Sequence, residues 1–205
     1  MRYKWLNIKN NQKLIVFFNG WGMDECVVKH LDCENFDILM FYDYNTLGTD
    51  FDYESLNVYP EKNLIAWSMG VMVGSMYKWD SNCFTKTVAI NGTLKPINEK
   101  FGIHPKIYDL TIKGFNAKGR KRFIDSMFNE VIDINCNREI EEQHSELIAL
   151  KNYQGDESFK YNKVLISNND KIIPTKSQVE FWGIEPNLES GHCPFFSFTK
   201  WSELL

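Results

Sequence analysis

Short, strongly apolar runs alternate along this chain with segments in which apolar residues recur at helical spacing. The apolar runs are rich in β-branched and aromatic residues, and they predict strands at residues 14–18, 36–41, 63–67, 87–90 and 163–167. A run without polar positions, such as the first of these, is typical of a strand that is covered on both faces. Weaker runs predict an edge strand at 3–8 and a last strand near 184–188.

Helical spacing predicts helices between the strands, at residues 24–30, 69–79, 175–182 and 194–203. This alternation indicates an α/β fold with a mainly parallel sheet and helices on both faces. It fails at residues 93–160, where polar, helix-forming sequence predicts a helical lid inserted in one domain that spans residues 1–205. A separate domain of the size of the insertion would have little core of its own.

The junction of the third predicted strand and its helix has the pattern of a nucleophile elbow. Residues 66–70 are A-W-S-M-G, a variant of the G-x-S-x-G motif that lifts a serine hydroxyl out of a sharp strand-to-helix turn. The turn is tight, so the positions two before and two after the serine must be small, as Ala66 and Gly70 are. Ser68 is therefore the candidate nucleophile.

A serine nucleophile needs a base to take its proton and an acid to orient that base. In α/β folds of this kind the chain order is serine, acid, histidine, each after a strand. Asp170 follows the strand at 163–167, and His192 lies in the loop that enters the last predicted helix. The alternative for Asp170 is a solvated aspartate in a turn.

Other candidates for the base and the nucleophile are placed less well. His30 and His144 fall in helical patterns and are expected at the surface, and His104 lies in the predicted lid. Cys193 is adjacent to His192, but the side chains of adjacent residues seldom point at each other. These alternatives leave His192 as the base and Ser68 as the nucleophile.

Backbone amides are expected to form an oxyanion hole for the tetrahedral intermediate. One amide is that of Met69, directly after the nucleophile. The other is that of Trp21, in the glycine-containing loop F-N-G-W-G-M-D at residues 18–24. The alternative is that this loop is an ordinary strand-to-helix turn.

Composition excludes several other classes of protein. The 205 residues are 43% hydrophobic and carry a net charge of −4, which fits a globular protein and argues against nucleic-acid binding. We find no apolar run of membrane-spanning length and no signal-peptide pattern. Five cysteines without C-x-x-C spacing suggest neither a zinc site nor a disulfide framework, and the sequon at residues 91–93 is taken as chance. We expect a cytoplasmic monomer without cofactor or metal.

Four motifs together resemble the pimeloyl-[acyl-carrier protein] methyl ester esterases of the BioG type. They are residues 17–24, 66–70, 169–174 and 190–195. The resemblance covers the sheet core and the C-terminal third and is faint in the lid. It implies an α/β-hydrolase that releases methanol from a pimeloyl methyl ester on an acyl carrier protein in biotin biosynthesis, with Ser68, His192 and Asp170 as triad and Trp21 and Met69 as oxyanion donors.

Basic residues in the predicted lid suit an acidic carrier protein and the phosphate of its phosphopantetheine arm. The cluster consists of Lys113, Lys118, Arg120, Lys121 and Arg122. A solvated helix face explains the cluster equally well. The aromatic residues Phe115, Phe123 and Phe128 line an acyl channel or form the packing face of the lid. Two alternatives stay open: a general short-chain carboxylesterase or thioesterase without a carrier partner, and a hydrolase-like fold that only binds a ligand.

Overall fold

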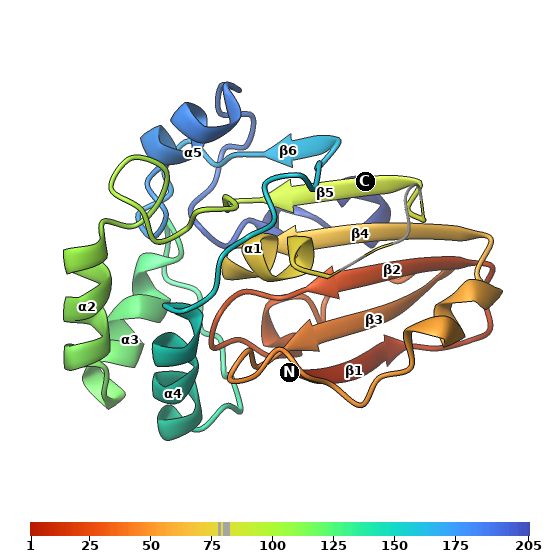
Figure 1. Cartoon of the computed structure of the whole chain (residues 1–205), viewed down its shortest axis with the longest axis horizontal. Helices are drawn as coiled ribbons and strands as arrows, with labels where there is room; N and C mark the ends of the chain where they lie inside the picture. The colour runs from red at the N-terminus through yellow and green to blue at the C-terminus, as the bar shows by residue number, and fades with distance from the viewer. Residues whose placement is uncertain (78, 80–82) are drawn as a thin grey trace.

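The computed structural model describes residues 1–77, 79 and 83–205, and these residues build a six-stranded sheet (Figure 1). The strand order is β1-β3-β2-β4-β5-β6; β1 is antiparallel to β3 and the other neighbours are parallel. The strands are β1 Arg2–Asn7, β2 Lys13–Phe18, β3 Phe36–Tyr42, β4 Glu61–Trp67, β5 Lys86–Ile90 and β6 Lys163–Leu165. The predicted α/β fold is confirmed.

Side chains of the central strands alternate between two hydrophobic cores, one on each face of the sheet. On β2, Leu14, Val16 and Phe18 join the core under helix α1 (Met69–Ser75). Ile15 and Phe17 point to the opposite core. Because both faces are covered, residues 14–18 of β2 are apolar at every position, as the sequence predicted.

The remaining α-helices follow the parallel strands. Helices α2, α3 and α4 lie in the segment between β5 and β6, beyond the carboxyl ends of the parallel strands, and α5 follows β6 (Figure 1). Their bounds are α2 Pro105–Gly114, α3 Ala117–Ser126, α4 Ile140–Leu150 and α5 Thr175–Trp182. Within the described residues, none of the helices combines the length and the apolar character needed to span a bilayer.

Two segments predicted as α-helices form 3₁₀ helices instead. The expected helix at 24–30 is a single 3₁₀ turn, Glu25–Val27, because three consecutive residues starting at Cys26 are buried and leave no solvent face. The expected helix at 194–203 is two 3₁₀ helices, Phe195–Ser197 and Trp201–Leu204. Between them the extended backbone of residues 199–201 bonds to Asp32.

A further 3₁₀ helix, Tyr53–Val58, joins β3 to β4. Helix α1 is shorter than the predicted range 69–79, of which residue 78 lies outside the described residues.

The predicted strand at 184–188 reduces to one parallel bridge between Ser167 and Leu188. Pro186 has no amide hydrogen to give to a strand. Instead, the side chain of Asn187 donates to the Val164 carbonyl and accepts from the Ile166 amide. These side-chain bonds add to the short backbone pairing of residues 166–168 with residues 187–188.

Gly70 lets α1 approach the end of β2. A Cβ atom at this position would lie closer than 3.0 Å to the carbonyl oxygens of Phe18 and Asn19. Backbone atoms cannot move aside as a flexible side chain can, so this contact explains why the elbow requires a small residue two positions after Ser68.

We expect Gly70→Ala to lower the free energy of unfolding by at least about 1–3 kcal/mol, the usual cost of overpacking. The matched control is Gly114→Ala, because a Cβ at the end of α2 meets nothing within 4 Å. Chemical denaturation of both variants measures the difference. Equal stability of the two variants would contradict the proposed close approach.

Candidate active site

Ser68 lies in the turn between β4 and α1 with a strained backbone. Its φ of 58° and ψ of −125° are rare for a residue with a side chain. The Ser68 amide donates to the Ile90 carbonyl at 2.9 Å, and its own carbonyl accepts from Val71 at 3.1 Å. These bonds to β5 and to α1 stabilise the strained backbone. A strained serine between a strand and a helix is the geometry of a nucleophile elbow.

Ser68, His192 and Asp170 lie in one line of hydrogen bonds. The Ser68 Oγ is 2.8 Å from His192 Nε2, and His192 Nδ1 is 2.8 Å from Asp170 Oδ2. All three side chains are buried. Three residues far apart in sequence thus meet in the hydrogen-bonding order of a catalytic triad.

The Asp170 carboxylate is held by donors on both oxygens. Oδ1 accepts from the amides of Ile172 and Ile173 at 2.8 and 3.0 Å, and Oδ2 accepts from Gln178 Nε2 at 2.8 Å as well as from His192. The role of Gln178 was not predicted from the sequence. The one signal there is its place in the predicted helix, eight residues after the aspartate; the structure buries its side chain fully.

The loop that carries His192 is held by β4 and β5. The His192 carbonyl accepts from Trp67 Nε1 at 2.8 Å and from Asn91 Nδ2 at 2.9 Å. Asn91 also donates to Ser167 Oγ at 2.7 Å, and its side chain is fully buried. The asparagine of the sequon at 91–93 is therefore a buried residue that hydrogen-bonds the loop of His192. This role was not predicted from the sequence.

The two predicted oxyanion donors are backbone amides without an acceptor. Within the described part of the chain, neither the Trp21 amide nor the Met69 amide donates to a protein group. Gly20 and Gly22 flank Trp21, and Gly22 has a φ of +71°, which favours glycine. Free amides at the start of α1 and in the loop after β2 suit a negatively charged oxygen.

The other histidines and Cys193 have structural contacts. His104 caps α2, His30 Nε2 bonds the Phe195 carbonyl, and His144 Nε2 bonds the Ile112 carbonyl, so His144 is half-buried and not at the surface as expected. Burial raises the pKa of the Cys193 thiol. Ser68 and not Cys193 is bonded to the imidazole of His192.

The basic cluster of α2 and α3 divides into paired and unpaired residues. The Arg120 guanidinium donates to the Cys136 carbonyl at 2.6 Å, and Lys121 pairs with Asp125 one turn further on. Lys113, Lys118 and Arg122 form no ion pair with another described residue. The free charges of the cluster are therefore fewer than the sequence suggested.

An apolar groove of about 350 Å³ lies between α2 and α3 and is lined in part by Arg122 and Ile172. Phe115 and Phe123 also line it, and both rings pack on Trp21 with centroids 5.1 and 4.7 Å away. Two rings of the groove wall therefore contact the side chain of Trp21. Phe128 packs against Phe196 elsewhere.

Asp24, Cys26 and Cys136 come together in a buried cluster, with their ligand atoms within 4.8 Å of one another. Such a set could hold a metal ion, which the cysteine spacing did not suggest. Each oxygen of Asp24 already accepts an amide, from Cys26 or Asn137, and the Cys136 thiol donates to the Gly22 carbonyl. Burial alone would raise the pKa of Asp24, but these amides lower it. These bonds tie residues 136 and 137 to the loop at residues 18–24.

Comparison with known proteins places this arrangement in a family. A family model described as "Pimeloyl-ACP methyl esterase BioG" matches residues 1–204. The chain belongs to the BioG family. A crystal structure of BioG from Haemophilus influenzae superposes with a TM-score of 0.88 at 30% identity, covering 100% of this chain and 99% of that one.

Other relatives agree with membership of the BioG family. An uncharacterized Haemophilus influenzae protein is 33% identical over 94% of both chains. A Bacteroides fragilis protein named malonyl-[acyl-carrier protein] O-methyltransferase is 36% identical over 83% of this chain, which spans only 36% of that protein's length. A putative aryl esterase from Burkholderia cenocepacia shares the fold, with a TM-score of 0.67 at 14% identity over 95% of this chain and 88% of that one. Together the family and the fold support a carboxylic ester hydrolase.

We expect Gln178→Met, which keeps the size of the side chain but removes its donor, to lower the free energy of unfolding by about 1–3 kcal/mol, because a buried carboxylate loses a partner. The control is Glu180→Gln on the same helix, since Glu180 forms an ion pair with exposed Lys100. Thermal and denaturant unfolding measure both variants. A Gln178→Met variant as stable as the control would show that Asp170 does not depend on this bond.

Proposed function

We propose that this chain is a serine carboxylesterase that hydrolyses the methyl ester of a pimeloyl group on an acyl carrier protein. The observation that carries this proposal is the hydrogen-bonded line of Ser68, His192 and Asp170 in a chain of the BioG family. The products are methanol and the free ω-carboxylate, still bound to the carrier. The proposal needs no cofactor or metal.

In the first half of the reaction, the Ser68 Oγ attacks the ester carbonyl carbon while His192 Nε2 takes the hydroxyl proton. Asp170 at His192 Nδ1 keeps the imidazole in the required tautomer and stabilises its charged form. The carbonyl oxygen becomes negative and accepts from the Trp21 and Met69 amides. The C–O bond to methanol then breaks as His192 returns the proton to the leaving oxygen.

In the second half, water attacks the acyl-serine ester. His192 takes a proton from the water, the same two amides stabilise the second tetrahedral intermediate, and the bond to Ser68 Oγ breaks. His192 gives the proton back to Ser68. One ester and one water are consumed, and one acid and one methanol are released.

The groove between α2 and α3 supports an acyl chain that enters from a carrier. Phe115, Phe123 and Ile172 offer apolar contacts at its inner part, while Ile107 and Leu110 of α2 are more than half exposed. Arg122 adds a positive charge to the groove wall, which suits the phosphate of a phosphopantetheine arm. We propose the segment 93–160 as the lid over the site, and a cytoplasmic monomer stays a prediction.

A methyl ester substrate also agrees with the Bacteroides fragilis relative. That protein is named for transferring a methyl group to a malonyl-[acyl-carrier protein], and a segment of it is similar to this chain. An enzyme that hydrolyses a methyl ester on a carrier-bound acyl group would remove such a group. The substrate itself can be tested by mass spectrometry, which should show loss of the methyl group from pimeloyl-carrier-protein methyl ester.

We expect Ser68→Ala to reduce kcat on this substrate by several orders of magnitude, since loss of a triad member leaves only binding and oxyanion stabilisation. Circular dichroism should show an unchanged fold, because the alanine keeps the same backbone. Steady-state kinetics on the carrier-bound methyl ester and on p-nitrophenyl acetate check the result. Activity near that of the wild type would refute the assignment of the nucleophile.

We expect the double substitution of Lys118 and Arg122 to alanine to raise KM for the carrier-bound ester by roughly ten-fold and to weaken its dependence on salt. KM for p-nitrophenyl acetate should not change. The control is Lys29→Ala, an exposed lysine outside the insertion. An equal loss on both substrates would favour the alternative, a general carboxylesterase or thioesterase without a carrier partner.

A further inference from the structure

A buried carboxylate on α4 touches the loop that carries the Trp21 amide. Glu146 is fully buried, and its Oε2 accepts from the Gly22 amide at 3.3 Å while its Oε1 accepts from the Tyr44 amide at 2.9 Å. These amides belong to the loop after β2 and to the turn after β3. One side chain therefore joins three segments that are far apart in the sequence.

Gln143, one turn earlier on α4, holds the same loop at two further points. Its backbone carbonyl accepts from Trp21 Nε1 at 2.9 Å, and its Nε2 donates to the Gly22 carbonyl at 2.6 Å. With Glu146, the helix binds the indole of Trp21 and both polar groups of the Gly22 backbone. The Trp21 amide itself is left without an acceptor in the part of the chain that the structure describes.

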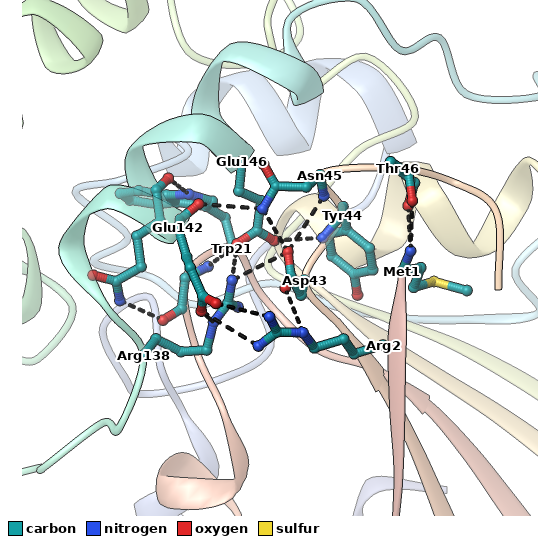
Figure 2. Close-up of polar contacts among 12 residues, drawn as sticks. Met1, Arg2, Trp21, Asp43, Tyr44, Asn45, Thr46, Arg138, Glu142 and Glu146 are labelled. Carbon is teal, nitrogen blue, oxygen red and sulfur yellow. Dashed lines mark hydrogen bonds and ion pairs between the residues drawn. The ribbon is translucent and has the colours of Figure 1, made fainter. Parts of the chain in front are cut away.

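Positive charge keeps the Glu146 carboxylate in place. Arg138 Nη2 lies 3.2 Å from Glu146 Oε2 and 3.2 Å from Asp43 Oδ1, and Figure 2 shows these contacts joined into one network. The Arg138 side chain is itself buried. Burial raises the pKa of Glu146 to about 7, against the guanidinium of Arg138, which lowers it.

We propose that Glu146 is a positioning residue for the oxyanion hole, which fixes the Gly22 peptide so that the adjacent Trp21 amide points at the developing oxyanion. The inference rests on the proposed function, in which Trp21 donates to that oxygen. A carboxylate is required because two amides from different segments each need an acceptor, and it offers one oxygen to each. A glutamine in its place has one acceptor oxygen and would turn a donor toward the second amide.

The test compares Glu146→Gln with Glu142→Gln, both on α4 in the intact protein. Glu142 pairs with Arg2 and Arg138 near the surface, and among the described residues it forms no hydrogen bond or ion pair with residues 18–24. The readouts are kcat and KM for p-nitrophenyl butyrate and the Ki of 1,1,1-trifluoroheptan-2-one, which forms a tetrahedral adduct with the serine. The oxyanion exists in the transition state and in the adduct but not in bound substrate.

For Glu146→Gln we expect kcat to fall roughly 10- to 100-fold, less than the loss usual for deleting a donor outright. The Ki of the ketone should rise by the same factor, while KM changes less than about two-fold. Glu142→Gln should behave as wild type. A merely structural role would instead lower the melting temperature and leave kcat and Ki of the folded protein unchanged.

The inference is overturned if Glu146→Gln matches Glu142→Gln in kcat and Ki, or if KM and Ki rise together. Should Glu146→Gln not fold, Gln143→Met gives the same test without a change of buried charge, and the same pattern of kcat, KM and Ki is expected. Failure of the proposed function is distinct, because the wild type would then show no Ser68-dependent hydrolysis at all.

Discussion

The backbone of Ser68 is the constraint on which the site depends. A non-glycine residue at φ 58° and ψ −125° is strained, and it persists only where the surroundings hold it. Here the hold comes from the bond of the Ser68 amide to β5 and from the close approach of Gly70 to the end of β2. The same turn directs the hydroxyl to His192 and, among the residues that the structure describes, leaves the Met69 amide without an acceptor at the start of α1. One strained residue thereby sets the direction of both the proposed nucleophile and a proposed oxyanion donor.

The insertion between β5 and β6 does more than cover the sheet. Its helix α4 reaches the loop after β2 through Gln143 and Glu146, while α2 and α3 carry the aromatic rings that pack on Trp21. The candidate site is therefore assembled from two parts of the fold: segments after β4 and β6 supply the proposed triad, and the insertion holds one side of the proposed oxyanion hole.

Much of the fold and of the candidate site could be predicted because short stretches of sequence carry the signals. The apolar runs of the central strands and the A-W-S-M-G turn need only neighbouring residues to be recognised, and the order of Ser68, Asp170 and His192 follows from the fold. Glu146 could not be found in this way, since its partners lie more than 100 residues away and an isolated glutamate on a polar helix looks solvated. The role of Asn91 could not be predicted either, because its partners are also distant in sequence. The helix expected at 194–203 was wrong for a related reason. Its conformation depends on contacts with residues far away in the sequence, such as Asp32.

We propose that His192 and Asp170 activate the hydroxyl of Ser68. The most direct measurement treats the native protein with a fluorophosphonate probe and maps the adduct by peptide mass spectrometry. We expect one adduct, on Ser68, which disappears when the protein is denatured before labelling. An unlabelled Ser68 in folded protein, or an adduct on Cys193 instead, would contradict it.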